Sequence, residues 1–129
     1  VSSLNDCFFC QNAHGALAAH YMQCDMDQID AIKQDPGNMP ITDKMKALLA
    51  IAGSVQQGGK HVTTEQVAYA KSLGITDMEI HDTVLIAAAF CMFNRYVDGL
   101  ATWAPQDREF YVNRAARRAE EGYTSAPHK

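Results

Sequence analysis

Apolar residues recur along this chain at the three- and four-residue intervals of an α-helix, and no segment shows the strict alternation typical of a β-strand. Capping residues and glycines divide the pattern into separate helices. Thr63 with Gln66 and Thr76 with Glu79 have the spacing of a capping box. The predicted helices cover about residues 6–23, 26–34, 42–58, 63–74, the roughly 25 residues from 76 onward, and 105–121.

The two ends of the chain carry their own signals. Asn5 or Asp6 can cap the first helix, and Pro105 is favourable at the first position of the last one. The residues after Glu121 are predicted to form a tail. The opening letters VSSLNDC resemble the exit of one helix and the start of the next, which is consistent with a missing upstream segment. We predict a single all-α domain over residues 1–129, built from about six helices.

The helix that starts at Thr76 contains an uninterrupted apolar stretch from Val84 to Phe93. A helix that is apolar on every face is expected to be buried all round, inside the subunit or between subunits. Because such a helix is too apolar to face water, we predict an assembly of identical subunits. The stretch is much shorter than the roughly 20 apolar residues that a membrane-spanning helix needs, so no membrane association is expected.

The charge pattern argues against nucleic acid as a partner. The chain has a formal net charge of -4, and no basic run is long enough to follow a phosphate backbone. Arg114, Arg117 and Arg118 do cluster near the end of the chain. Glu120 and Glu121 follow at once, however, and such a mixture is typical of a solvated helix terminus.

Four cysteines without secretory features do not suggest a disulfide framework, so we expect a cytoplasmic protein. In a reducing compartment a Cys-x-x-Cys pair is more often redox-active or metal-binding than structural. Cys7 and Cys10 form such a pair within NDCFFCQNAHGALAAHY, and His14 lies four residues further on. On a helix, neighbours three and four residues apart share a face, so these three side chains are predicted to lie in a row.

That placement favours thiol chemistry. The first turn of a helix has unpaired N–H groups and a dipole that favour negative charge, so we expect a lowered thiol pKa and a larger thiolate fraction. His14, one turn further on, can accept the proton of Cys10. Cys7 can then attack an oxidised Cys10 and close a short disulfide.

Two other interpretations of the motif stay open, namely a zinc site and inert packing. Zinc needs four nitrogen or sulfur ligands, so a fourth would have to come from His20, Cys24 or His81. We favour the redox interpretation because His14 and a helix cap accompany the pair. Taken alone, Cys24 and Cys91 are expected to be small buried hydrophobic residues, and His20 and His81 to be surface or hydrogen-bonded histidines.

Polar residues interrupt the apolar helix at NRYVDGL. Arg95 can pair with Asp98 three residues on, and Asn94 lies four residues before Asp98. This cluster either fixes helix packing or a subunit interface, or it forms a pocket wall near the thiols. Six aromatic residues could line an apolar pocket for an organic hydroperoxide, although such residues more often pack in the core. They are Phe8, Phe9, Phe90, Phe93, Tyr96 and Trp103.

The segment CFFCQNAHGALA resembles the C-x-x-C-x-x-x-H signature of alkyl hydroperoxidase D-like proteins, in the carboxymuconolactone decarboxylase superfamily. The stretch GGKHVTTEQVAYAKSLGITDMEIHDTVLIAAAFCMFNRYVDGLA resembles the second half of the peroxidase-related branch, so the likeness covers most of the chain. The best-known members carry a glutamate about a dozen residues before the first cysteine, a position that here precedes Val1. They also carry a histidine where this chain has Phe9.

The resemblance implies an all-helical subunit that assembles into trimers, hexamers or similar oligomers. It implies a thiol-dependent peroxidase or disulfide reductase, in which Cys10 attacks the peroxide, Cys7 resolves the product and His14 relays the proton. Cys7 would also contact an external dithiol reductant, such as a lipoyl or thioredoxin-like protein. No metal, haem or flavin is required.

Three alternatives to a peroxidase accompany this resemblance. The same fold supports lactone decarboxylation, which needs no dithiol. A non-enzymatic zinc-binding module would hold about one metal per chain, by the four-ligand rule for structural zinc. A structural oligomer with a vestigial site would keep its assembly and show no thiol chemistry.

Overall fold

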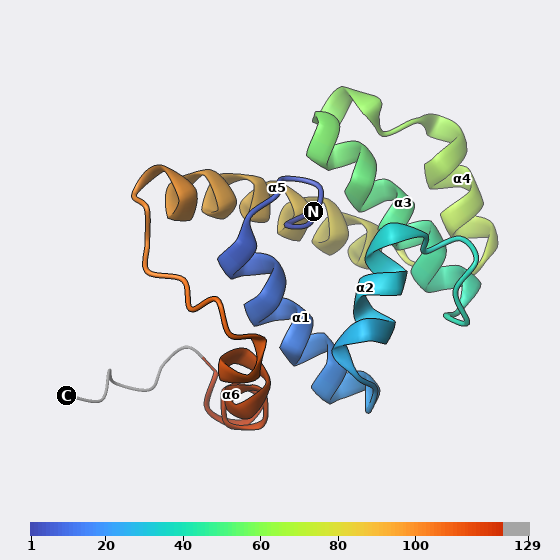
Figure 1. Ribbon diagram of the computed structural model, residues 1–129. Coiled ribbons are helices and arrows are strands. Elements are labelled where there is room, and N and C mark those ends of the chain that lie inside the picture. The colour runs from blue at the N-terminus through green and yellow to red at the C-terminus, as the bar shows by residue number, and fades with distance from the viewer. Residues whose placement is uncertain (123–129) are drawn as a thin grey trace.

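Six α-helices and a short 3₁₀ turn make up the secondary structure of residues 1–122, the part of the chain that the computed structural model describes (Figure 1). No strand occurs within that range. The all-α prediction and the number of helices are confirmed. The elements are α1 (Phe8–Met22), α2 (Met26–Gln34), α3 (Asp43–Gln57), η1 (Gly59–His61), α4 (Thr64–Ser72), α5 (Asp77–Gly99) and α6 (Arg108–Glu121).

Local capping signals set most of the helix starts. Thr63 and Thr76 each accept a hydrogen bond from the third helical amide, and the side chain at that third position accepts one from the amide of the threonine, so both predicted capping boxes form. Thr42 caps α3 as predicted. Asp25 builds a third capping box at the start of α2, which the sequence analysis did not single out.

The predicted cap of the first helix is wrong. Cys7 is the N-cap residue of α1, in an extended conformation, and it makes no side-chain cap hydrogen bond. Asp6, just before it, has a left-handed backbone with φ of 54°. Asn5 is unavailable as a cap because its side chain bonds to other helices, through Asn94 and Gln56.

The predicted start of the last helix is also wrong. Asp107 is the N-cap of α6, and its side chain accepts a hydrogen bond from the amide of Glu109. Pro105 lies in the preceding loop, where its carbonyl accepts a hydrogen bond of 2.9 Å from the Tyr111 hydroxyl. A carboxylate N-cap satisfies an open helix amide, which a proline at N1 does not, so the helix begins after Asp107.

The helices form two groups with separate small cores. In the first group, α2 and α6 both pack against α1; in the second, α4 and α5 pack against α3 (Figure 1). The N-terminal segment runs beside α5 and thus connects the groups, since Asn5 and Ser2 bond to Asn94 of α5. The buried apolar residues of the first core are Ala16, Tyr111 and Ala115, and those of the second are Ala47, Ile51, Ala70 and Ile75.

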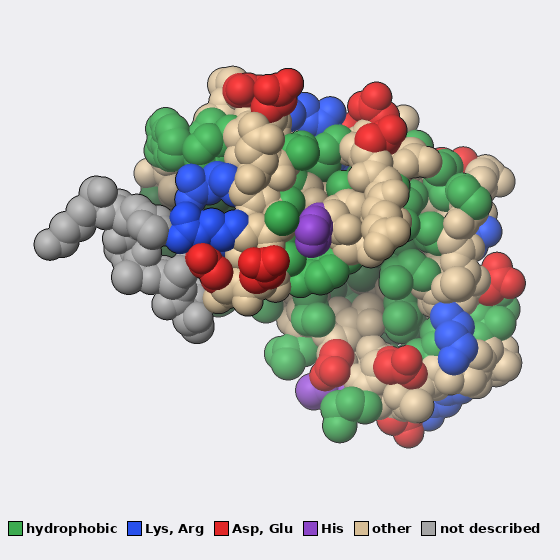
Figure 2. All heavy atoms as spheres, turned by 90° about the horizontal axis from the view of Figure 1, so that it is seen from below, with side chains coloured by type: hydrophobic (Ala, Val, Ile, Leu, Met, Phe, Trp, Pro, Cys, Tyr) green, Lys and Arg blue, Asp and Glu red, His purple; other side chains and the backbone are tan. Residues whose placement is uncertain are grey.

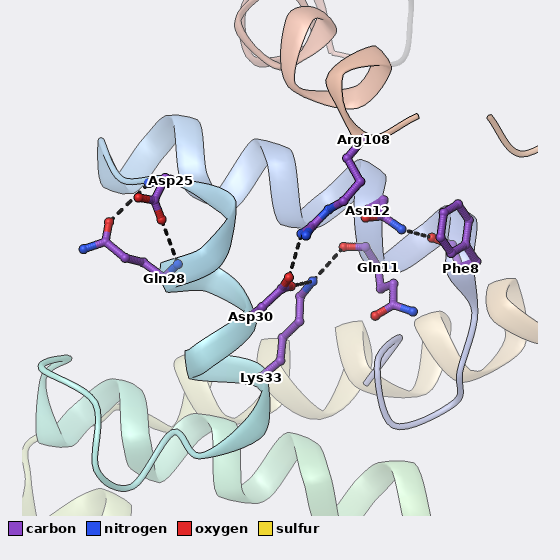
Figure 3. Close-up of polar contacts among 8 residues, drawn as sticks. All are labelled: Phe8, Gln11, Asn12, Asp25, Gln28, Asp30, Lys33 and Arg108. Carbon is purple, nitrogen blue, oxygen red and sulfur yellow. Dashed lines mark hydrogen bonds and ion pairs between the residues drawn. The ribbon is translucent and has the colours of Figure 1, made fainter. Parts of the chain in front are cut away.

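An ionic junction fastens α2 to α6 and α1 (Figure 3). The Asp30 carboxylate accepts hydrogen bonds from Lys33 at 2.8 Å and from Arg108 at 2.7 Å. Lys33 Nζ also donates to the carbonyl of Gln11 at 3.2 Å. Burial alone would raise the pKa of Asp30, but the hydrogen bonds and charges of Lys33 and Arg108 together lower it. The carboxylate therefore stays ionised at neutral pH and holds both cations in place.

The long helix α5 was predicted to be buried inside the subunit or between subunits, and the single chain excludes the first alternative. Only Ala87 and Asn94 of α5 are buried. Large apolar side chains, spaced three, four and seven residues apart, stay exposed along it: Leu85, Ile86, Met92, Phe93, Tyr96 and Leu100. Among the helices of residues 1–122, none combines the length and the hydropathy needed to cross a bilayer.

Candidate functional site

The predicted dithiol lies at the start of α1, with both sulfurs buried. Cys7 is 0% exposed and Cys10 is 3% exposed, and neither is in a disulfide. Cys7 precedes the helix and Cys10 is its third residue, so the main chain holds both in fixed positions. The amide of Cys7 bonds to the carbonyl of Ser2, and the carbonyl of Cys7 accepts from the amide of Gln11. The cysteines are thus neighbours in a defined geometry.

The thiol of Cys7 is held in its protonated form. Burial raises the pKa of Cys7 from its ordinary value of 9.0 to about 12, and the Cys10 thiol and the Asp98 carboxylate act in the same direction. The expectation that the helix start lowers this pKa is wrong for Cys7, because desolvation of a fully buried sulfur outweighs the helix terminus. At neutral pH, Cys7 is therefore a neutral thiol.

The raised pKa of Cys7 predicts a loss of stability in alkali. The thiol of the unfolded chain has its ordinary pKa of 9.0, whereas burial raises the pKa of the folded chain's thiol to about 12. The free energy of unfolding therefore falls as pH rises through that interval. We expect a shallower fall for Cys7→Ser, measured by urea unfolding at pH 8 and pH 10.5. Burial also raises the pKa of Tyr111, which leaves some slope in both proteins; equal slopes would contradict the prediction.

His14 lies one turn along α1 from Cys10, as predicted, but it bonds to the main chain. Its Nδ1 lies 3.0 Å from the carbonyl oxygen of Cys10, so Nδ1 carries the hydrogen and Nε2 is the basic nitrogen. The ring packs edge-on against Phe90, with centroids 4.6 Å apart. Burial lowers the pKa of His14, and the hydrogen bond to Cys10 offsets this only in part. The imidazole is therefore neutral near pH 7 and able to accept a proton.

A cavity of about 490 Å³ opens between α1, α2, α3 and α5, and both Cys10 and His14 line it. Cys7 is not among its described lining residues. The rest of the lining is mainly apolar, and Phe90 contributes a ring. Lys33 also lines the cavity, in its ion pair with Asp30; no local pattern in the sequence places it there, because α2 brings it to the site from another part of the chain. A small molecule in this cavity reaches Cys10 before it reaches Cys7.

A buried polar network holds the segment that leads into Cys7. Asn94 is 1% exposed; its Oδ1 accepts from Asn5 at 2.9 Å and its Nδ2 donates to Ser2 at 3.1 Å. Asn5 also accepts from Gln56 at 2.9 Å and lies 3.7 Å from the Cys91 sulfur. The network ties the N-terminal segment to α3 and α5. Asn94 stands out in the sequence as a polar residue in an apolar helix, whereas nothing local in the sequence marks its partners.

The rest of the polar cluster on α5 differs from the prediction. Arg95 does not pair with Asp98; its guanidinium donates to the main-chain carbonyl of Cys91 at 2.7 Å. Asp98 instead acts on the thiol of Cys7. One end of this cluster therefore fixes packing, and the other lies beside the dithiol. The sequence alone left these two roles as alternatives.

The remaining predicted candidates lie apart from the dithiol or outside the core. Cys24 and Cys91 are half-buried rather than fully buried. His20 is exposed beside Tyr21, and His81 is exposed beside Asp82. Within residues 1–122, no three His, Cys, Asp or Glu side chains meet in an arrangement that could hold a metal ion.

The aromatic residues divide between core, cavities and surface. Phe8 and Phe9 pack against the buried cluster of Ala16, Tyr111 and Ala115, as core packing predicts. Phe90 lines the cavity of Cys10, whereas Phe9 and Trp103 line a second cavity on α1. Phe93 and Tyr96 lie among the exposed residues of α5, and Trp103 is 73% exposed. Core packing is thus the wrong interpretation for these last three residues.

Comparisons of the chain with protein-family models, with curated proteins and with solved structures find no match. The interpretation of the site therefore depends on its own geometry. That geometry consists of a buried dithiol at a helix start, a neutral imidazole one turn away, and an apolar cavity that reaches only the second cysteine.

Proposed function

We propose that this protein is a thiol-dependent oxidoreductase that reduces hydroperoxides through Cys7 and Cys10. The observation that carries the proposal is that Cys10 and His14 line the same cavity. Cys7 is buried close to Cys10 in the chain but does not line that cavity. The two thiols therefore have different roles: Cys10 reacts with the substrate, and Cys7 reacts with the oxidised Cys10. The mainly apolar lining suits an organic hydroperoxide.

In the first step, His14 accepts the proton of the Cys10 thiol, and the thiolate attacks the distal oxygen of the hydroperoxide. The O–O bond breaks, Cys10 becomes a sulfenic acid, and the alkoxide takes a proton from His14 to leave as an alcohol. A neutral His14 is needed at the start, and its lowered pKa supplies that form at pH 7.

In the second step, the Cys7 sulfur attacks the Cys10 sulfur, the S–O bond breaks and water leaves. The product is a Cys7–Cys10 disulfide, which an external dithiol of the lipoyl or thioredoxin-like class then reduces. Because the pKa of Cys7 is raised to about 12, we expect the loss of its proton to make this step slower than the first. No metal, haem or flavin takes part in this scheme.

The proposal includes membership of the alkyl hydroperoxidase D-like group, in the peroxidase-related branch of the carboxymuconolactone decarboxylase superfamily. Support comes from the C-x-x-C-x-x-x-H motif at the start of a helix in an all-α chain. A cytoplasmic location is part of the same proposal, because a working dithiol of this kind needs a reducing compartment.

The denatured intact mass of the fully reduced protein, before and after one equivalent of an organic hydroperoxide, tests this function. We expect a loss of two hydrogens that digestion maps to a Cys7–Cys10 disulfide. An unchanged mass with both thiols free would overturn the proposal. Turnover of a lactone by a protein that lacks both cysteines would point to decarboxylation instead.

We further propose that the exposed apolar residues of α5 pack against copies of the same chain, in a trimer or hexamer. Leu85, Met92 and Tyr96 are between 57% and 66% exposed in the single chain, and they recur on one side of the helix. Contiguous apolar surface of this kind marks an interaction site in soluble proteins. Identical subunits can cover it through a closed symmetric contact.

Leu85→Glu should dissociate this assembly. An unpaired carboxylate buried at the centre of an apolar interface costs several kcal/mol, roughly enough to produce monomers at micromolar concentration. Light scattering coupled to size exclusion measures the mass. Tyr69→Glu, on the exposed side of α4, is the matched control and should leave the assembly intact. A monomeric parent protein would exclude the proposed assembly.

A further inference from the structure

A second cavity, also about 490 Å³, lies between α1, α6 and the loop before α6. Phe9, Leu17, Trp103 and Phe110 line it, and its wall is predominantly apolar. Cys10 is not among its described lining residues, whereas His14 lines both cavities. The volume is within the range of small-molecule sites. The peroxidase scheme does not use this space.

Positive charge is concentrated at this cavity. Arg114 and Arg118 are among its lining residues, and no acidic residue is among those described. The Arg114 guanidinium lies over the Phe110 ring, 5.0 Å from its centroid, and within residues 1–122 no carboxylate pairs with it. Arg118 differs, because it already donates to the carbonyl of Gly122 at 3.3 Å. Figure 2 shows a group of basic side chains on the face seen from below, with acidic side chains along one edge of it.

We propose that this α1–α6 cavity binds a small amphipathic monocarboxylate, with its alkyl or aryl body against the aromatic wall and its carboxylate on Arg114. Stacking on Phe110 restrains the guanidinium, and its planar fork matches a carboxylate in a bidentate contact. The apolar walls supply affinity for the body of the ligand by removing it from water. Binding at this site requires no thiol chemistry, so it can be measured without the proposed peroxidase activity.

Trp103 is the only tryptophan of the chain and lines the cavity, so its fluorescence reports directly on binding. We expect octanoate to change the emission of the full-length reduced protein in a saturable manner. Octan-1-ol, which has the same chain without the charge, should bind roughly tenfold or more weakly, because a charge-assisted hydrogen-bonded contact is lost. Equal affinities for the two ligands, or no saturable change with octanoate, would overturn the proposal.

Arg114→Gln should weaken octanoate binding by roughly tenfold or more and leave octanol binding unchanged, because only the charged contact is removed. Arg117→Gln is the matched control on the same helix, because Arg117 bonds to Glu121 and is not among the described lining residues. The Arg117→Gln protein should bind octanoate as tightly as the parent protein does. Circular dichroism checks that both variants fold. Octanoate binding that survives in Arg114→Gln, or that falls equally in both variants, would refute the role of Arg114.

Discussion

Cys10→Ser should lose hydroperoxide reduction altogether, down to the uncatalysed rate. A serine hydroxyl is almost fully protonated at neutral pH and is a far weaker nucleophile towards peroxide oxygen than a thiolate. Cys7 cannot substitute for Cys10, because it does not line the cavity and its pKa of about 12 keeps it protonated. Consumption of an organic hydroperoxide, followed with an external dithiol as reductant, measures the effect.

Cys7→Ser separates the two steps of the reaction. This variant keeps Cys10 in the cavity, so we expect it to react once with peroxide and to stop at the sulfenic acid, which a dione reagent traps for mass analysis. Cys91→Ser and Cys24→Ser are the controls, because both residues are half-buried and lie outside the dithiol. If Cys7→Ser accumulated no sulfenic acid while Cys10→Ser retained turnover, the roles of the two cysteines would be reversed.

The helices could be predicted from the sequence because their signals are local. A capping box joins residues three apart, so Thr63 and Thr76 identify helix starts without knowledge of the rest of the chain. The same locality explains why His14 lies one turn from Cys10 as predicted. Cys7 was predicted to share their face of the helix, but it precedes α1 and does not line the cavity that they share.

The features that were mispredicted depend on distant partners. Asn5 has a good capping side chain, but it bonds to Gln56 and Asn94, which are 51 and 89 residues away. Cys7 has a raised pKa because the folded chain excludes water from it, and no local pattern reports that exclusion. Electrostatics at the site thus follow from tertiary burial, which outweighs the contribution of the helix terminus.

The apolar pattern of α5 predicted burial inside the subunit or between subunits, and the single chain buries only Ala87 and Asn94 of this helix. Periodicity reports that a surface avoids water; it does not say which molecule covers that surface. In the single chain, α3 and the N-terminal segment cover one side of α5, and Leu85, Met92 and Tyr96 stay exposed on another. The sequence prediction left both alternatives open, and the fold removes the one in which the chain itself buries the whole helix.

Asn94→Leu should destabilise the protein by about 1–3 kcal/mol, because leucine has a similar volume but leaves the half-buried side chains of Asn5 and Ser2 without this hydrogen-bond partner. Urea unfolding measures the change. Asn113→Leu, on the exposed side of α6, is the matched control and should stay within about 0.5 kcal/mol of the parent.

The same substitution should also slow closure of the disulfide more than the reaction of Cys10 with peroxide. Asn94 holds the segment before Cys7, whereas Cys10 is held by α1 itself, so loosening that segment displaces only the resolving thiol. Rapid mixing with hydroperoxide separates the two rates: trapped sulfenic acid should build up in Asn94→Leu and not in Asn113→Leu. An equal slowing of both steps would mean that Asn94 supports the fold as a whole, and that the N-terminal segment does not set the position of Cys7.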